Sequence, residues 1–391
     1  MLNTQFSPWP AYSQEEAEAV KNILLSNKVN YWTGNEGKAF EKEFAAWVGS
    51  EYAIAVSNGT VALELSLAAL AIVPGDEVIV TPRTFFATVS SIVNIGARPV
   101  FADVDINSQN ITVDSIKQVL SSKTKAIICV HLAGWPCDMD PIMELAEQHH
   151  LYVIEDCAQA HGAKYKGRSV GSIGHIGAWS FCQDKIITTG GEGGMVTTSD
   201  QALWLKMWSL KDHGKSWKAV YEQQHPPGFR WLHEGFGTNW RMTEMQAAVG
   251  RIQLKQMSEW VKKRQLFAER INNACEKYDC IRVTRPPSSI QHVYYKCYVF
   301  VKPEKLPNNW SRNRIIEEIT KRGVPCYQGT CSEVYLEKAF DKTQFRPTKR
   351  LPIAKQLGET SLMFLVHPSL TEGELEKMCF TINEVLSLVE S

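Results

Sequence analysis

The sequence contains no CxxC pair, although ten cysteines are spread along its 391 residues. Cysteine pairs of that spacing are typical zinc ligands, so their absence argues against a zinc site, and we predict no bound metal. Cys129 and Cys157 lie within apolar runs, where a free thiol packs as a small hydrophobic side chain. This use of cysteine is typical of a reducing compartment.

Long apolar runs and an excess of charge of one sign are also lacking. No apolar window approaches the roughly 18 residues that a membrane-spanning helix needs, and residues 1–10 lack the basic and apolar regions of a signal peptide. Lys+Arg and Asp+Glu both total 42, so the formal net charge is zero. We therefore expect a cytoplasmic protein that binds neither nucleic acid nor a membrane.

The chain is long enough for two domains, because a single core stops growing at roughly 250 to 300 residues. A capping box at Ser13 predicts a first helix over 14–26, and Phe40, Phe44 and Trp47 mark a second. Strands and helices then alternate. Strands are predicted over 52–56, 77–81, 98–103, 126–132 and 151–154, and helices over 61–71, from 82 onward, 113–119 and 141–150. This alternation indicates an α/β fold with a mostly parallel sheet, whose ligands bind at the carboxyl ends of the strands.

The composition of the chain changes in its last third. A helix over 202–210 is followed by a polar, Trp-rich loop over 215–234 and by a long helix that starts at Thr243. Beyond it we predict a strand over 294–301 and helices over 315–322 and 372–389. We place a large domain at residues 1–255 and a smaller α+β domain at residues 256–391.

Residues 151–198 carry the groups most suited to chemistry. The strand over 151–154 ends at Glu155 and Asp156, a second short run over 177–181 leads to Lys185, and a glycine cluster over 190–194 follows. One carboxylate and one amine are therefore expected at the ends of neighbouring strands. A lysine in such a loop can simply be solvated, but a deprotonated lysine can also form a Schiff base with a carbonyl cofactor.

Pyridoxal phosphate is the carbonyl cofactor that these residues suit. Asp156 could hold its pyridine nitrogen protonated, which makes the ring an electron sink, and Gln159 could reach the ring hydroxyl. The turn over 57–60 opens directly into a helix, an arrangement that receives phosphate. The candidate phosphate ligands are Gly59, Thr60 and Ser180. Phe85 could cover the ring, although an aromatic residue at this position can equally belong to the core.

Four separated motifs resemble those of the DegT/DnrJ/EryC1/StrS family of sugar aminotransferases. They read EDCAQAHG over 155–162, SFCQDK over 180–185, TGGEGGM over 189–195 and GTNWRM over 237–242. The similarity runs in register from Gln14 to about residue 385. Members of this family are pyridoxal-phosphate enzymes of the aspartate-aminotransferase fold (fold type I). The resemblance therefore implies that fold and transaminase activity.

The resemblance also implies a role for each candidate residue. Lys185 would carry the cofactor and shuttle a proton, Asp156 would pair with the pyridine nitrogen, and the other cofactor contacts would be Gln159, Phe85, Gly59, Thr60 and Ser180. In this family the asparagine that matches Asn239 reaches the phosphate of the neighbouring subunit, which implies a homodimer with two shared sites. Members that act as dehydratases have histidine where this chain has Lys185.

The expected donor is L-glutamate and the expected acceptor is a nucleotide-linked keto-deoxysugar. The resemblance favours C-4 amination of a dTDP-4-keto-6-deoxyhexose, in the biosynthesis of a surface polysaccharide such as O-antigen or of a glycoside. Candidate substrate contacts are Tyr31, Trp32, Thr33, Tyr295 and Tyr327, although the first three could also be a packed loop. The segments over 292–296 and 324–330 differ from many relatives, so C-3 and C-4 amination both stay open.

Three other functions are alternatives to this one. Amination of a cyclitol ketone would use the same lysine but no nucleotide. A regulator that binds the cofactor without turnover is disfavoured, because both Lys185 and Asp156 are present. Dinucleotide binding is rejected, because its fingerprint needs glycines between a strand and a helix, whereas those over 190–194 lead into a strand.

Overall fold

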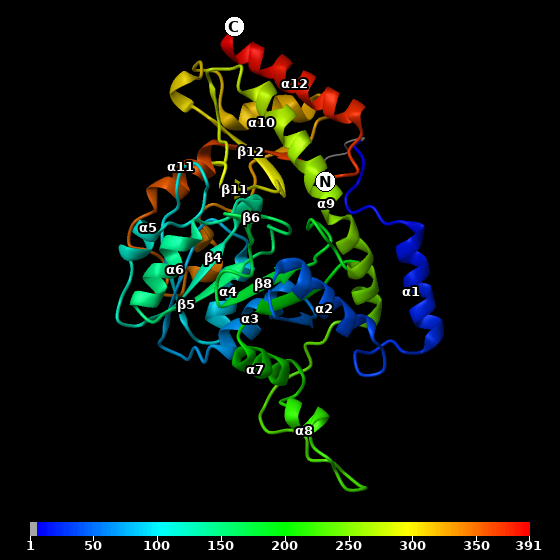
Figure 1. The fold of residues 1–391 in the computed structure, drawn as a ribbon. Helices are drawn as coiled ribbons and strands as arrows, with labels where there is room; N and C mark the ends of the chain where they lie inside the picture. The colour runs from blue at the N-terminus through cyan, green and yellow to red at the C-terminus, as the bar shows by residue number, and fades with distance from the viewer. Residues whose placement is uncertain (1–5) are drawn as a thin grey trace.

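A computed structural model describes residues 6–391, and a seven-stranded sheet lies at its centre (Figure 1). The strand order is β1-β9-β8-β5-β4-β2-β3, and only β9 runs against its neighbours. The predicted α/β fold with a mostly parallel sheet is thus confirmed. The strands are β1 (Tyr52–Val56), β2 (Glu77–Val80), β3 (Arg98–Phe101), β4 (Thr124–Val130), β5 (Tyr152–Asp156), β8 (Ile176–Ser180) and β9 (Gly194–Thr198).

Helices cover both faces of this sheet, because alternate residues of each strand point to opposite sides. Val80 and Ile128 face α3 (Gly59–Ala69), α4 (Phe86–Asn94) and α7 (Gln201–Lys211). Their neighbours Ile79 and Ile127 face α5 (Val113–Lys117), α6 (Met139–Gln148) and α11 (Pro352–Thr360). At the β1–β9 end, that second face is covered by α2 (Glu36–Val48) and α9 (Glu244–Cys275). The strands are buried on both sides, as their apolar sequences predict.

A second core forms around an antiparallel sheet in the last third of the chain. Its order is β10-β12-β14-β13, with bounds Ile281–Val283, Lys296–Val301, Ser361–Leu365 and Cys326–Tyr327. It packs against the C-terminal half of α9, against α10 (Arg312–Lys321) and against α12 (Glu372–Glu390), all in the upper part of Figure 1. The predicted domain boundary at residue 255 falls inside the uninterrupted helix α9. The division into two domains stays a prediction.

The remaining elements are short. They are α1 (Gln14–Ser26), which matches its prediction, α8 (Trp217–Tyr221), and a small sheet of β11 (Ile290–Gln291), β6 (Lys164–Tyr165) and β7 (Arg168–Ser169). Single turns of 3₁₀ helix occur at Leu132–Gly134, Pro303–Lys305, Val334–Leu336 and Lys338–Phe340. Among residues 6–391, no helix combines the length and the hydropathy that a bilayer crossing requires.

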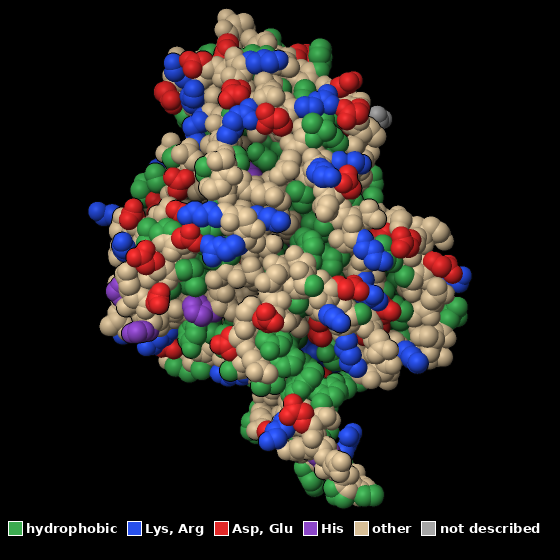
Figure 2. All heavy atoms as spheres, in the orientation of Figure 1, with side chains coloured by type: hydrophobic (Ala, Val, Ile, Leu, Met, Phe, Trp, Pro, Cys, Tyr) green, Lys and Arg blue, Asp and Glu red, His purple; other side chains and the backbone are tan. Residues whose placement is uncertain are grey.

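Residues 213–237 form a projecting segment, which we call the arm (Figure 1). The sequence predicts a loop here, and the arm does contain little regular structure apart from α8. Three of its aromatic side chains are strongly exposed, namely Phe229 at 78%, Trp231 at 84% and Phe236 at 100%. Figure 2 shows hydrophobic side chains at the tip of the arm. Large exposed apolar patches are uncommon on monomeric proteins and are a common feature of interaction surfaces.

Candidate active site

A cavity of 570 Å³ opens where the parallel strands end. This volume lies within the range of about 300–1,000 Å³ that is usual for cofactor and small-molecule sites. The cavity brings together residues that are far apart in the sequence. Seven of the predicted cofactor contacts line it, namely Gly59, Thr60, Phe85, Asp156, Gln159, Ser180 and Lys185.

Asp156, the last residue of β5, presents a buried carboxylate to this cavity. Its Oδ2 accepts a hydrogen bond from Thr88 Oγ1 at 2.9 Å, and its Oδ1 accepts one from the Ala158 N–H at 3.2 Å. Since Thr88 gives its proton to Asp156, Thr84 must donate in the 2.8 Å contact between the two threonine hydroxyls. Burial raises the pKa of Asp156, while the hydrogen bonds from Thr88 and Ala158 and the charge of Lys185 oppose that rise.

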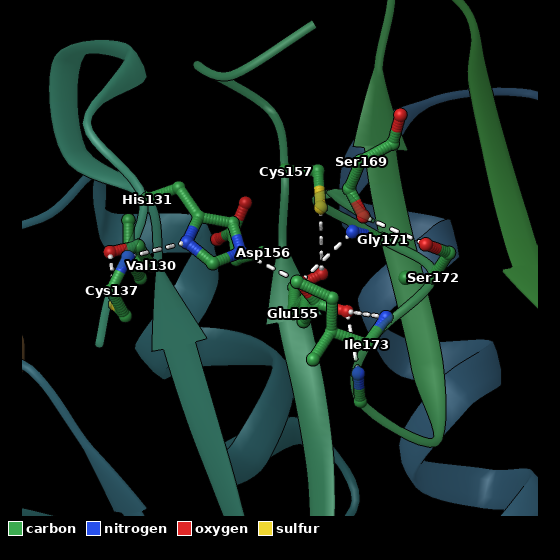
Figure 3. A network of polar contacts seen from close by, with 12 residues as sticks. Val130, His131, Cys137, Glu155, Asp156, Cys157, Ser169, Gly171, Ser172 and Ile173 are labelled. Atoms are coloured by element: carbon green, nitrogen blue, oxygen red, sulfur yellow. Dashed lines mark hydrogen bonds and ion pairs between the residues drawn. The ribbon is translucent and has the colours of Figure 1, made fainter. Parts of the chain in front are cut away.

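Glu155, the preceding residue, points to the other side of β5 and anchors the end of this strand (Figure 3). Its two carboxylate oxygens accept from His131 Nε2 at 2.9 Å and from the N–H groups of Gly171, Ile173 and Gly174 at 2.6–2.9 Å. Burial alone would raise the pKa of Glu155, but the hydrogen bonds from His131, Gly171 and Gly174 outweigh burial and lower it. The carboxylate therefore stays ionised.

His131, Glu155 and Cys157 also lie close enough together to hold an ion. However, His131 Nδ1 accepts from the Cys137 N–H at 3.0 Å, so Nε2 carries the ring proton and donates it to Glu155. Burial raises the pKa of the Cys157 thiol well above its usual range, which keeps it protonated. The ring nitrogens of His131 and the carboxylate of Glu155 are thus engaged in hydrogen bonds, and the cluster stabilises the end of β5.

The amine of Lys185 contacts two polar side chains. Its Nζ lies 3.3 Å from the Tyr295 hydroxyl and 3.2 Å from Asp184 Oδ1, and the Tyr295 hydroxyl donates in turn to Asp184. Burial, together with the nearby charge of Asp184, raises the pKa of Tyr295 well above its usual value, so the phenol stays neutral. On the backbone side, the Trp9 indole donates to the Lys185 carbonyl at 2.8 Å.

The first turn of α3 approaches Ser180 very closely. A Cβ added to Gly59 would lie 2.5 Å from the Ser180 Cβ, so only glycine fits at this position. Asn58 caps the helix by accepting from the Val61 N–H at 2.9 Å. The N–H groups at the start of a helix have no partner within the helix, so those of Gly59 and Thr60 are suited to bind an anion.

Gln159 and Phe85 line the cavity walls. Gln159 Oε1 accepts from the Ala133 N–H at 2.9 Å, which fixes the amide and leaves its NH₂ group to donate. Phe85 is the N-cap residue of α4 and is 68% exposed. An aromatic ring left this open at a cavity is a surface that a bound ring could cover.

The other predicted contacts do not line this cavity. Asn239 is exposed and lies next to the arm, where it pairs with Asp212. Tyr31 and Trp32 pack in an aromatic cluster with Trp208, and Thr33 is exposed. Tyr327 is a half-buried residue of β13. The roles of these residues in substrate binding stay predictions, whereas Tyr295 does lie beside Lys185.

Sequence reasoning missed several residues that shape the site. Thr88 contacts Asp156 from the first turn of α4, and its signal was the repeat of hydroxyl residues at 84 and 88, one helical turn apart. His131 is the last residue before a 3₁₀ turn and meets Glu155 only because β4 and β5 are neighbours. Trp9 reaches Lys185 across 176 positions, and no local pattern could reveal that contact.

Comparison with known proteins agrees with this geometry. The family model described as "DegT/DnrJ/EryC1/StrS aminotransferase family" matches residues 10–383. The chain is 36% identical to GDP-perosamine synthase of Escherichia coli O157:H7, covering 97% of both chains. It is 32% identical to dTDP-3-amino-3,6-dideoxy-alpha-D-galactopyranose transaminase of Aneurinibacillus thermoaerophilus, covering 95% of both.

A solved structure extends the similarity to three dimensions. The X-ray structure of an aminotransferase from Psychrobacter cryohalolentis superimposes with a TM-score of 0.97 at 64% identity, covering 99% of this chain and all of the other. The matches span the large sheet, the C-terminal sheet and both sides of the cavity. The chain thus belongs to the DegT/DnrJ/EryC1/StrS family, as a nucleotide-sugar aminotransferase whose cofactor is pyridoxal 5'-phosphate.

Proposed function

We propose that this chain transfers the amino group of L-glutamate to C-4 of a nucleotide-linked 4-keto-6-deoxyhexose, with dTDP as the nucleotide. The observation that carries the proposal is the lysine amine of Lys185 facing the same cavity as the buried carboxylate of Asp156. Support for C-4 comes from the perosamine synthase, which acts at that carbon. The product would be an amino sugar for a surface polysaccharide such as O-antigen.

The residues of the cavity fit the cofactor. The donor groups at the start of α3, with Ser180, would hold its phosphate, since a helix N-terminus favours an anion. Asp156 would accept from the pyridine nitrogen, and the ring would lie against Phe85 within reach of the Gln159 amide. When bound, pyridoxal phosphate supplies an electron sink for the carbanion that forms as the amino group moves.

Lys185 would hold the cofactor covalently and then move the proton. Once released, its Nζ would take the proton from the donor's α-carbon and return it at the exocyclic carbon of the cofactor, and do the reverse for the sugar. Tyr295 and Asp184 orient this amine from one side, at 3.3 and 3.2 Å. Asp156 would keep the pyridine ring cationic throughout.

We also propose that the active enzyme is a homodimer with shared sites. The arm carries three exposed aromatic residues, and Asn239 follows directly after it. A second copy of the chain is the occupant that would bury these aromatic side chains. In that arrangement Asn239 would reach the phosphate end of the partner's cavity.

An absorbance titration of the purified holoenzyme tests the reaction. Glutamate should convert the band of the lysine-bound cofactor into that of the aminated cofactor, and dTDP-4-keto-6-deoxyglucose should reverse the change. A reversal by the GDP- or UDP-linked sugar alone would leave C-4 amination intact but contradict the choice of nucleotide. A protein that shows no cofactor band after adding pyridoxal phosphate would contradict the role of Lys185.

The relative that forms a 3-amino sugar favours one further candidate, amination at C-3. A 3-keto sugar that reverses the band where the 4-keto sugar does not would establish it. Reversal of the band by a cyclitol ketone would establish an acceptor without a nucleotide.

A further inference from the structure

A second, smaller cavity lies beside the catalytic lysine. It holds 210 Å³ and is lined by residues that are far apart in the sequence, including Trp9, Asp184, Arg264, Tyr295, Lys296 and His367. It shares Asp184 with the larger cavity. Lys185 Nζ lies 5.1 Å from the centre of the Tyr295 ring and Lys296 Nζ lies 4.7 Å from it, so the same ring contacts both amines.

Arg264 brings a buried guanidinium to this cavity. The residue is 1% exposed, and its Nη1 donates to the carbonyls of Val366 and Tyr295. Within residues 6–391, its Nε and Nη2 have no hydrogen-bond partner. Buried N–H groups of a charged side chain are costly when unpaired, so they indicate a missing acceptor.

The positive charge around this cavity exceeds the negative charge. Among the described residues, no salt bridge includes Arg264 or Lys296, while Asp184 is already paired with Lys185 and Tyr295. Burial lowers the pKa of His367 to about 3, so its ring is neutral. Burial also lowers the pKa of Lys296 to about 8. The charge of Asp184 opposes this shift, whereas the charges of Arg264 and Lys185 add to it. An anion in the cavity would compensate both cations.

The volume of the cavity limits the size of the anion that it can hold. Its 210 Å³ lies below the range of about 300–1,000 Å³ for drug-sized ligands, so it suits an amino acid rather than a nucleotide sugar. A planar guanidinium with two free N–H groups matches the two oxygens of a carboxylate.

We propose that Arg264 and Lys296 bind a carboxylate of the amino donor. This assignment rests on the proposed transfer from glutamate, and it places the donor's carboxylate beside Tyr295, in the cavity that shares Asp184 with the larger one. The sugar nucleotide, which is too large for this cavity, would occupy the wider one in the other half-reaction.

The test measures the binding of glutarate, a dicarboxylate without an amino group, to the holoenzyme by calorimetry. Arg264→Gln and Lys296→Met should each weaken binding about 10- to 100-fold, the loss expected for a hydrogen bond to a charged group. The glutamate concentration that half-saturates the donor half-reaction should rise by the same factor, whereas that of the sugar nucleotide should stay unchanged. Arg264→Lys should recover part of the affinity.

Arg270→Met is the matched control, because Arg270 lies on the same helix and pairs with Glu372 outside the cavity. Unchanged glutarate affinity in Lys296→Met and in a folded Arg264 variant would overturn the proposal, and so would a larger loss for the sugar nucleotide than for glutarate. Glutarate binding does not depend on turnover. A wild-type enzyme that binds glutarate through Arg264 but fails to react with glutamate would therefore contradict the proposed function and not the anion site.

Discussion

The amine of Lys185 lies within 3.3 Å of one hydroxyl and one carboxylate, those of Tyr295 and Asp184. We predict that Lys185→Ala abolishes the band of the lysine-bound cofactor and lowers turnover by at least about 100-fold, the usual contribution of a proton-transferring group. Absorbance and steady-state rates measure the two effects. Lys206→Ala, at an exposed position of α7, is the control. Full activity of Lys185→Ala would overturn the assignment.

Thr88 allows a milder substitution, on the side of the cavity where Asp156 lies. Thr88→Val keeps the shape of the side chain but removes the 2.9 Å hydrogen bond to Asp156. A hydrogen bond to the ionised form lowers a carboxyl pKa, so its loss should raise the pKa of Asp156 further. We expect activity to fall about tenfold and its decline at low pH to begin at a higher pH than in the wild type. A pH–rate profile that does not move would contradict this role.

At the scale of a single residue, the sequence identified the groups but not the contacts between them. Asp156 could be predicted because it ends a strand, and Lys185 because it follows one closely, and both lie within recognisable motifs. Arg264 could not, since an arginine in the middle of a long polar helix is indistinguishable from a solvated one. Its burial depends on Trp9 and on the carbonyl of Val366, both more than a hundred positions away.

The end of β5 depends on Glu155, whose carboxylate receives four hydrogen bonds. Glu155→Gln cannot accept all of them, so we predict a loss of about 3 kcal/mol of stability at neutral pH, since hydrogen bonds to a charged group contribute about 1.5–3 kcal/mol each. The folded pKa is depressed below its ordinary value of 4.5, so the wild-type advantage is present above that pH and is lost as pH falls through the folded pKa. Urea denaturation at several pH values measures this. A difference that persists unchanged in acid would contradict it.

The start of α3 depends on the absence of a side chain at Gly59. Gly59→Val would push β-carbon and methyl groups into Ser180, which a Cβ alone already meets at 2.5 Å. We expect a loss of about 1–3 kcal/mol of stability and weaker retention of pyridoxal phosphate during dialysis. Gly373→Ala, whose added Cβ meets nothing within 4 Å, should change neither. Normal retention in Gly59→Val would show that this turn does not hold the phosphate.

Longer helices and strands could be predicted from the sequence, and very short ones could not. The helix over 14–26 and the strand over 52–56 have the predicted bounds, because capping and apolar runs mark their ends. The two-residue strands β6, β7, β11 and β13 carry too few residues for a period to be visible. Strand β14 and helix α11 were missed as well. Helix α11 begins at Pro352, a usual first helical residue, but it runs directly into β14 with no turn residue between them.

The whole molecule exposes the aromatic residues of its arm and leaves Asn239 outside its own cavity. If two copies share their sites, a mixture of Lys185→Ala and Asn239→Ala chains should form mixed dimers with one intact site each. Activity should therefore reappear on mixing two variants that are weak alone. Sedimentation of a Phe229→Ser, Trp231→Ser variant should show dissociation. Mixed dimers without any recovered activity would contradict the sharing of sites.

Glu155 and Asp156 are adjacent, yet they serve opposite sides of the central sheet. A strand alternates its side chains, so a one-residue deletion within β5 would exchange the two acids. The glutamate would then enter the cofactor cavity, and the shorter aspartate would face His131 and the loop over 171–174. A point substitution in this strand affects one side of the sheet, whereas an insertion or deletion affects both. Insertions and deletions among relatives should therefore be confined to segments such as the arm, where no neighbouring side chains have to face opposite sides of a sheet.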